Sequence, residues 1–505
     1  MNESMKSIVR VSFLSALTLA TAGSHVRAED ITNQVRSLTL HECVGRALEN
    51  NLEIKSERIN PTIGSWGVVG AQGVYDPTLT GSINYEDNTQ PLDPERAASL
   101  GTASIKQQQL TPQLSLGGKL PTGAQYGLSA IDTRTSGTLA SNFVYTGTAA
   151  VSLTQPLLKN FGLGVNAATI RIARASRSIA VENFVQLVMS KINDVSTAYY
   201  ELVYAIENHK AALETRELAR QLLDENRQRE KIGTMSRLDV IQAESGVASS
   251  EQNVITTERA IKDNENTLKR LICQQVMEFR GVSLTPVDYP VVQMVETDVA
   301  RSTRTALQMR ADYLSAKQVL EKQNILVQFN RNQLWPEIDL QGSYGLNGRS
   351  DSGFADFVDN TASTKRPVWT VGLTVTLPLG DRQARANYHT ARLHAEQQLL
   401  SLKGLEQDII VRVDNAVGHV ETNLKSVEAA RAANRLAQES LDAEKKKLLT
   451  GTSTTFLVLQ AQSQLAAARS AEIRARADYS ESLVALDLAE GTVLQKNNIV
   501  LDEKF

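Results

Sequence analysis

The feature that most constrains the fold of this chain is an internal repeat. The segment KIGTMSRLDVIQAES at 231–245 and the segment LTGTSTTFLVLQAQS at 449–463 align without gaps at an offset of 218. They share a Gly, a Thr, a Val, the pair Gln-Ala and a Ser, and each precedes a long Ala-rich stretch. A chain that contains the same turn twice is expected to place it at two equivalent points of its fold.

Further matches extend the repeat over most of the chain. RALENNLEIKS at 46–56 aligns with TALQMRADYLS at 305–315, and VSLTQPLLKNFG aligns with LTVTLPLGDRQA so that Pro156 matches Pro378. The matches occur in the same order in both halves, which indicates two copies of one structural unit. The sequence predicts a first repeat at 29–285, a linker at 286–295, a second repeat at 296–491 and a C-terminal tail at 492–505.

Residues 1–28 have the pattern of a secretory signal peptide. Lys6 and Arg10 precede the apolar stretch VSFLSALTLATAG, and VRA ends at Ala28 as a small-x-small cleavage site. No run of 18 or more apolar residues follows, so we expect no transmembrane helix. An exported chain of this kind is either soluble outside the cytoplasm or crosses an outer membrane as a β-barrel. The formal net charge of −3, without a basic patch, argues against a nucleic-acid partner.

Each repeat is predicted to open with a helix and to end in a long antiparallel helical hairpin. Thr39 and Glu42 have capping-box spacing at the first opening helix. The stretches 166–231 and 382–448 contain no proline and no turn cluster, so each is expected to form one helix roughly 100 Å long. The repeated turn, near 233 and near 451, then reverses the chain, and a helix of about 40–50 residues returns from it. Small residues in the returning helices favour close, coiled-coil-like packing.

Between the opening helix and the hairpin, apolar and small polar residues alternate. In TLTGSINYE, Leu79, Gly81, Ile83 and Tyr85 share one face, and the other face carries Thr, Ser and Asn. Segments of about 10 residues suit inclined strands that cross a membrane, although a small soluble β-domain is the alternative interpretation. We expect the long loops to lie on one side of strands at 77–88, 109–120, 124–133, 145–155, 338–347 and 368–377.

Six strands are too few to close a barrel within one chain, since about eight is the usual lower limit. An open sheet edge cannot be exposed to lipid. If the strands cross a membrane, the barrel must therefore be shared between several copies of the chain.

No catalytic, cofactor or metal site is expected. His41, His209, His389, His394 and His419 are scattered along predicted helices without metal-ligand spacing. The lone G-x-G in NFGLGVNAA lacks the rest of a phosphate loop.

The chain has only two cysteines, Cys43 and Cys273. In an exported protein they form either a disulfide or two apolar helix positions, and the sequence does not distinguish these alternatives.

Taken in order, these features resemble the outer-membrane efflux protein family, the TolC-like outer membrane factors. The resemblance rests on the internal repeat, the opening helix, SLTQPLLKNFG entering a long helix, and the Gly-x-x-x-x-x-x-Val-x-x-Ala turn. It implies an α+β membrane protein in which three duplicated protomers share a transmembrane β-barrel, continued by a long periplasmic α-helical barrel. One departure is the strand count, because the family's protomer usually gives four strands, or twelve per trimer, whereas six would give eighteen.

The resemblance also implies a function and partners. Family members are passive exit ducts of tripartite efflux pumps and type I secretion systems. They dock to a periplasmic adaptor and to an inner-membrane transporter of the RND or ABC type. The expected location is the outer membrane with its lipid, and no enzyme activity is implied. The alternative function is an exported trimeric coiled-coil scaffold of the cell envelope, which would transport nothing.

By the same resemblance, the two turns form the periplasmic tip, where an adaptor docks and the duct closes. The implied docking residues are Gly233, Thr234, Met235, Ser236, Gly451, Thr452, Ser453 and Thr454. The implied gate residues of the first repeat are Gln228 and Asp239, which match the family's link positions.

The second repeat departs from the family pattern at these positions. Leu448 replaces a tyrosine and Ser453 an arginine, while Leu457 and Gln460 occupy the positions of two pore-ring aspartates. The family's acidic ring therefore has no counterpart here, and a hydrophobic constriction at Leu457 is an alternative. Asp239 also has capping-box spacing with Ser236, which offers a purely structural role for it.

Overall fold

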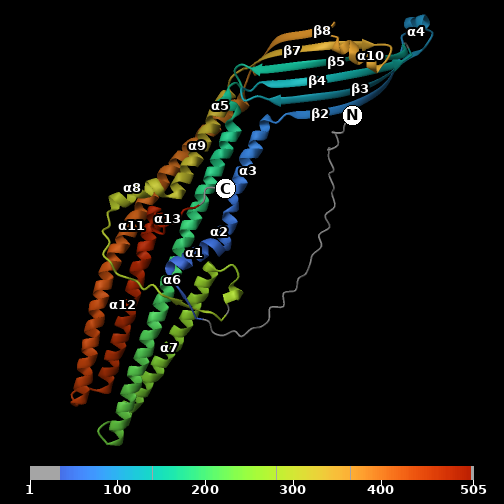
Figure 1. Cartoon of the computed structure of the whole chain (residues 1–505). Coiled ribbons are helices and arrows are strands. Elements are labelled where there is room, and N and C mark those ends of the chain that lie inside the picture. The colour runs from blue at the N-terminus through green and yellow to red at the C-terminus, as the bar shows by residue number, and fades with distance from the viewer. Residues whose placement is uncertain (1–34, 139, 280, 364, 502–505) are drawn as a thin grey trace, which may run out of the picture.

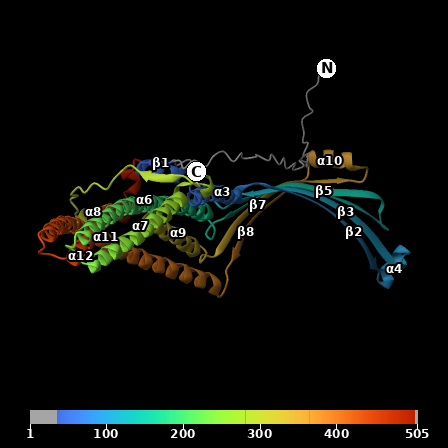
Figure 2. The same cartoon turned by 90° about the horizontal axis from the view of Figure 1, so that it is seen from below.

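The computed structural model describes residues 35–138, 140–279, 281–363 and 365–501, and the predicted signal peptide at 1–28 lies outside them. A β-sheet forms one end of the molecule, and long helices run away from it to two tips at the other end (Figure 1). Both the sheet and the layer of helices are curved when the molecule is seen from below (Figure 2). None of the helices formed by the described residues is both long enough and apolar enough to cross a membrane.

The large sheet contains six strands in the order β2-β3-β4-β5-β7-β8, and each neighbouring pair is antiparallel. It includes a strand for each of the six predicted segments. The expected long loop between 133 and 145 is wrong, because β4 continues to Gly137 and β5 begins at Ala140, so this connection is short. The strands are β2 (Thr78–Pro91), β3 (Ser104–Lys119), β4 (Gln125–Gly137), β5 (Ala140–Pro156), β7 (Glu337–Ser350) and β8 (Pro367–Thr376).

The register separates the sheet into an apolar face and a polar face, as the alternation predicts. One row across the sheet joins Leu79, Leu116, Leu128, Val151 and Tyr344. The neighbouring row on the opposite face consists of small polar or glycine residues. The apolar residues of β2 and β8 are largely exposed, since Ile83 is 74% and Val371 is 72% accessible.

Two helical hairpins form the long shaft. Helix α6 (Ala168–Lys231) pairs with α7 (Arg237–Ile272), and α11 (Arg382–Leu449) pairs with α12 (Thr455–Glu490). The outgoing helices have 64 and 68 residues, close to the predicted spans, whereas each returning helix has 36, fewer than expected. The hairpins meet where α6 packs against α12. Nearer the sheet, α9 (Ala311–Asn332) lies between α6 and α11, and α3 (Ile59–Gln72) lies along α6.

Short elements surround the middle of the shaft. Strand β1 (Val35–Leu38) pairs in parallel with β6 (Ser283–Pro286), and the capping box of Thr39 and Glu42 starts α1 as predicted. Buried apolar side chains from this region form one cluster with α6 and α7 and another with α11 and α12.

The remaining short elements of the whole fold are α1 (Leu40–Asn50), α2 (Leu52–Glu57), η1 (Gly73–Tyr75), α4 (Pro94–Leu100), α5 (Leu163–Asn166), η2 (Val276–Phe279), α8 (Val299–Met309), α10 (Phe354–Ala362) and α13 (Val493–Lys496).

The two cysteines lie in the first of these clusters. Cys43 and Cys273 are both buried, and they are not joined in a disulfide. Burial raises the pKa of the Cys43 thiol to about 12, so this thiol is protonated at neutral pH.

Candidate functional site at the helical tips

The repeated turn ends the outgoing helix of each hairpin with the same backbone motif. At the first tip, Gly233 has a φ of 81° and donates its N–H to the Glu230 carbonyl at 2.9 Å, and Thr234 donates to the Arg229 carbonyl at 2.9 Å. These two bonds define a Schellman motif, which requires a left-handed residue after the helix. Glycine occupies this conformation without the steric cost that a Cβ would bring.

The second tip repeats this geometry. Gly451 has a φ of 76° and donates to the Leu448 carbonyl at 3.2 Å, and Thr452 donates to the Lys447 carbonyl at 2.9 Å. The turn itself therefore explains the shared Gly. It also explains the shared Thr, whose hydroxyl donates to the same carbonyl as its N–H, at 3.1 Å for Thr234 and 3.2 Å for Thr452.

The returning helices begin with different caps. In α7 the Ser236 hydroxyl accepts from the Asp239 N–H at 3.3 Å, and the Asp239 carboxylate accepts from the Ser236 N–H at 3.3 Å and from its hydroxyl at 2.5 Å. The predicted capping box is therefore confirmed. In α12 the Thr454 hydroxyl accepts from the Leu457 N–H at 3.4 Å, and a leucine cannot return the second bond.

A buried polar contact joins the two hairpins close to their tips. The side-chain amide of Asn226 in α6 donates to the Thr455 hydroxyl in α12 at 3.1 Å and approaches the Asp239 carbonyl at 3.4 Å. Arg229 also reaches across to the Leu448 carbonyl at 3.4 Å. The Asn226 side chain is fully buried, and its carbonyl oxygen has no partner in the described part of the chain.

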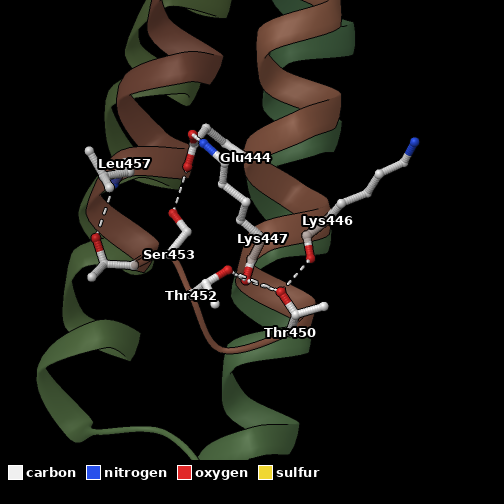
Figure 3. A network of polar contacts seen from close by, with 8 residues as sticks. Glu444, Lys446, Lys447, Thr450, Thr452, Ser453 and Leu457 are labelled. Carbon is white, nitrogen blue, oxygen red and sulfur yellow. Dashed lines mark hydrogen bonds and ion pairs between the residues drawn. The ribbon is translucent and has the colours of Figure 1, made fainter.

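A second polar cluster holds the turn of the α11–α12 hairpin (Figure 3). Glu444 accepts from the Ser453 hydroxyl at 2.7 Å and pairs with Lys447 at 2.6 Å. These contacts, with Lys447 the larger cause, hold the pKa of the Glu444 carboxyl below its usual value. Ser453 therefore supports its own turn, at the position that carries an arginine in the implied family pattern.

The predicted gate residues do not form one cluster. Gln228 and Gln460 are exposed, and Gln228 makes no side-chain hydrogen bond within the described ranges. Leu457 is 42% exposed beside the more exposed Phe456, so both present apolar surface at the second tip. Leu448 is buried and packs in a cluster with Leu222 and other residues between the hairpins. Of the two positions that match the family in the first repeat, Asp239 is engaged in capping.

Further from the tips, an ionic cluster joins the hairpins. Arg474 of α12 pairs with Glu201 of α6 at 2.7 Å and contacts Asp478 and Glu481 on its own helix. Burial, followed by the nearby Glu201 charge, raises the pKa of Glu481 to about 7. One Glu481 carboxylate oxygen is buried without a partner in the described segments. Sequence reasoning missed this cluster, because Glu201 lies 273 residues from Arg474 along the chain.

The described residues contain no group of three or more His, Cys, Asp or Glu that could hold a metal ion. The arrangement at the tips is one of turns, caps and interhelical contacts. Near the tips, the two hairpins are joined by the Asn226 and Arg229 hydrogen bonds and by the apolar cluster that contains Leu222 and Leu448.

Comparison with known proteins supports this architecture. The chain is 22% identical over 432 residues to nodulation protein T of Rhizobium leguminosarum bv. trifolii, which covers 83% of this chain and 86% of that protein. It is 25% identical over 438 residues to the outer membrane efflux protein BepC of Brucella suis biovar 1, covering 84% and 87%. Its fold is similar to that of the CmeC outer membrane channel of Campylobacter jejuni, with a TM-score of 0.64 and 18% identity over 92% of this chain and 90% of that one.

The model of the family described as outer membrane efflux protein matches two segments, residues 94–274 and 303–492, which together make up more than half of the chain. Each matched segment contains one of the two helical hairpins and its tip. The chain therefore belongs to the outer membrane efflux protein family, whose members lie in the outer membrane with a helical part in the periplasm.

Proposed function

We propose that this protein is the outer-membrane exit duct of a tripartite efflux pump or a type I secretion system. In this proposal three copies form a passive channel, which a periplasmic adaptor opens at the helical tips. An inner-membrane transporter of the RND or ABC type supplies the energy. The observation that carries the proposal is a curved sheet with two unpaired edges, continued by a curved layer of helices.

The free edges of the sheet support a closed ring of several copies. Among the residues that the structure describes, strands β2 and β8 each have one neighbouring strand, so each leaves a row of backbone groups that no other strand pairs with. Because β2 runs away from the helices and β8 runs back toward them, β8 of one copy beside β2 of the next keeps the antiparallel pattern. Three six-stranded sheets would then give a barrel of eighteen strands.

The helical layer also has edges that suit the same ring. Trp66 and Ile63 on α3 are 71% and 61% exposed, and Leu393 and Leu400 on α11 are 64% and 63% exposed. Helices α3 and α11 lie on opposite edges of the layer, where α3 packs on α6 and α11 packs on α9. Apolar surfaces on both edges favour a contact between α3 of one copy and α11 of the next. Repetition of this contact gives a closed ring when the rotation between successive copies adds up to a full circle.

In this proposal the tips close the duct when no partner is bound. A trimer would bring six turns together, three of each type, around the channel axis. The docking surface for the adaptor is then formed by Gly233, Thr234, Met235, Ser236, Gly451, Thr452, Ser453 and Thr454. Leu457 is the candidate constriction, with Gln460, Gln228 and Asp239 nearby on the returning and outgoing helices.

Electrical conductance tests the proposal directly. Purified protein added to planar lipid bilayers is expected to give discrete channel events, and deletion of the gene is expected to make cells more sensitive to toxic compounds. An envelope scaffold would anchor without a pore, so folded protein that inserts but never conducts would favour that alternative. Identification of the adaptor that co-purifies with the protein would then distinguish efflux from secretion.

A further inference from the structure

Helix α10, in the connection between β7 and β8, lies against one face of the sheet at the end far from the helical shaft (Figures 1 and 2). Its Phe357 side chain is only 6% exposed. The phenyl ring rests on Gly147 and Gly348, which are direct partners on β5 and β7. A Cβ at Gly147 would come within 2.6 Å of the ring, and a Cβ at Gly348 would overlap the Thr361 hydroxyl. Two facing glycines therefore form a specific seat for this helix on the apolar face.

A groove of about 860 Å³ lies beside this helix. Its floor is the row Gly81, Leu114, Ala130, Ala149 and Leu346, whose members are in register across five strands. Gly81, Ala130 and Ala149 are short compared with the Leu, Val and Tyr side chains of the adjacent row on the side of the helical shaft, so the sheet is hollow at these positions. The α10 side chains that line the groove are Phe354, Phe357, Val358, Thr361 and Ala362.

The groove continues along the sheet toward the helical shaft. A second hollow of about 470 Å³ shares Leu114, Ala130, Ala149 and Leu346 with the first. It is then lined by larger aliphatic and aromatic side chains of the same face, namely Leu79, Leu116, Leu128, Val151 and Tyr344. The two hollows form one elongated apolar track, a shape that suits a flexible chain better than a compact ligand.

The opposite end of the track is polar. Asp132 lines the first hollow, and its Oδ1 atom is buried without a hydrogen-bond partner in the described part of the chain. Two residues further along β4, on the same face, the Arg134 guanidinium lies 3.6 Å from the centre of the Phe143 ring. The track thus has two charged residues, Asp132 and Arg134, at one end and apolar side chains along the rest. This arrangement matches a lipid, which has a polar headgroup and hydrocarbon chains.

We propose that this track binds an acyl chain of a membrane lipid, with the headgroup beside Asp132 and Arg134. The inference rests on the proposed function, which turns the apolar face of the sheet toward the membrane and the α10 end toward the outside. The groove opens onto that face, so membrane lipid is its immediate neighbour. Helix α10 adds a wall that the rest of the apolar face lacks, and a chain in the track contacts protein on more sides than ordinary boundary lipid.

Photo-crosslinking tests this inference. The full chain is reconstituted in vesicles of phosphatidylethanolamine and phosphatidylglycerol that contain a small fraction of phosphatidylethanolamine with a diazirine on its acyl chain. After irradiation, labelled peptides are mapped by mass spectrometry. We expect labelling to concentrate on Leu114, Leu346 and Phe357, well above Val371 and Val375, which share the apolar face but lie outside both hollows.

Two matched substitutions complete the test. Ala149→Phe fills the floor of the track, and Val371→Phe adds similar bulk on β8, where the position is 72% exposed. We expect Ala149→Phe to lower labelling of the track about fourfold for each methylene group of the acyl chain that the phenyl ring displaces from the track. Val371→Phe should leave the labelling unchanged. Even labelling of the whole face, or no effect of Ala149→Phe, would overturn the proposed track.

Conductance of the same preparations separates the two proposals. Normal channels with even labelling would overturn only the lipid track. A preparation that neither conducts nor labels on the apolar face would overturn the proposed function and, with it, the track.

Discussion

Asn226 on α6 donates a hydrogen bond of 3.1 Å to Thr455 on α12, and both side chains are fully buried. The pair joins the two hairpins within about two helical turns of their tips. The strength of this hydrogen bond affects how easily the two hairpins separate. A buried amide that has lost its partner costs free energy, because it is then bonded neither to protein nor to water. Loss of the hydrogen bond between Asn226 and Thr455 is therefore expected to make separation of the hairpins easier.

Thr455→Val is expected to loosen the tips. The substitution keeps the shape of the side chain but removes the acceptor, which leaves the Asn226 amide with only the Asp239 carbonyl at 3.4 Å. The expected cost is about 1–3 kcal/mol. Hydrogen exchange of the tip amides should become about tenfold faster or more. Thr422→Val, at an exposed position on α11 away from the tips, is the control and should affect the Asn226 region little.

The double variant Asn226→Leu with Thr455→Val sharpens this prediction. Replacement of both partners by apolar groups removes the unpaired donor, so exchange should return toward the wild-type rate. A double variant as loose as Thr455→Val alone would mean that packing, and not the hydrogen bond, holds the hairpins together.

Gly451→Ala is expected to destabilise the second tip. Its φ of 76° lies in the left-handed region, where a Cβ costs about 1–2 kcal/mol. Gly404→Ala provides a control of opposite sign, because Gly404 lies inside α11 with nothing within 4 Å of an added Cβ. Alanine there should stabilise the helix by about 0.5–1 kcal/mol. Thermal unfolding midpoints should therefore move in opposite directions, and a common direction would refute the backbone argument.

Glu481→Gln is expected to stabilise the shaft at alkaline pH. The folded pKa of about 7 lies above the ordinary value of 4.5, so the native state binds more protons between these values. Stability therefore falls as the pH rises from 4.5 to 7, and the full penalty is present above pH 7. A neutral amide should raise the free energy of unfolding by about 1–3 kcal/mol at pH 8 and by much less at pH 5.

Unfolding midpoints at the two pH values measure this effect. Glu439→Gln, at an exposed position on α11, is the control and should show no pH-dependent gain. An equal gain for Glu481→Gln at both pH values would show that ionisation of this carboxyl is not the cause.

Much of this fold could be predicted from sequence because its signals are local. The absence of proline predicted the end of α11 to within one residue. The repeated glycine predicted the two turns at which the chain reverses direction. Alternation located the strands, but the small polar residues before Gly137 and after Ala140 were interpreted as a long loop. In the structure these residues belong to β4 and β5, which are separated only by a short connection. Pairing between the two strands outweighs the weak strand propensity of these residues.

The contacts that join distant segments were not predictable in this way. Asn226 and Thr455 are 229 residues apart, and an asparagine on a polar helix looks solvated in sequence. Helix α10 was hidden in a loop rich in Gly, Ser and Asp. Its signal was the spacing of Phe354, Phe357 and Val358, which fall on one helical face.

Leu457→Asp is expected to raise the resting conductance of the channel. Leu457 is 42% exposed at the second tip, at a position where the implied family pattern has an acidic residue. A ring of apolar side chains in a narrow channel excludes water and ions, whereas carboxylates keep it wet. Single-channel recordings in planar bilayers should therefore show a larger basal current for the variant. Leu436→Asp, at a position on α11 that is 57% exposed and lies away from the turn, is the control. Unchanged current in Leu457→Asp would place the constriction at another residue of the tips.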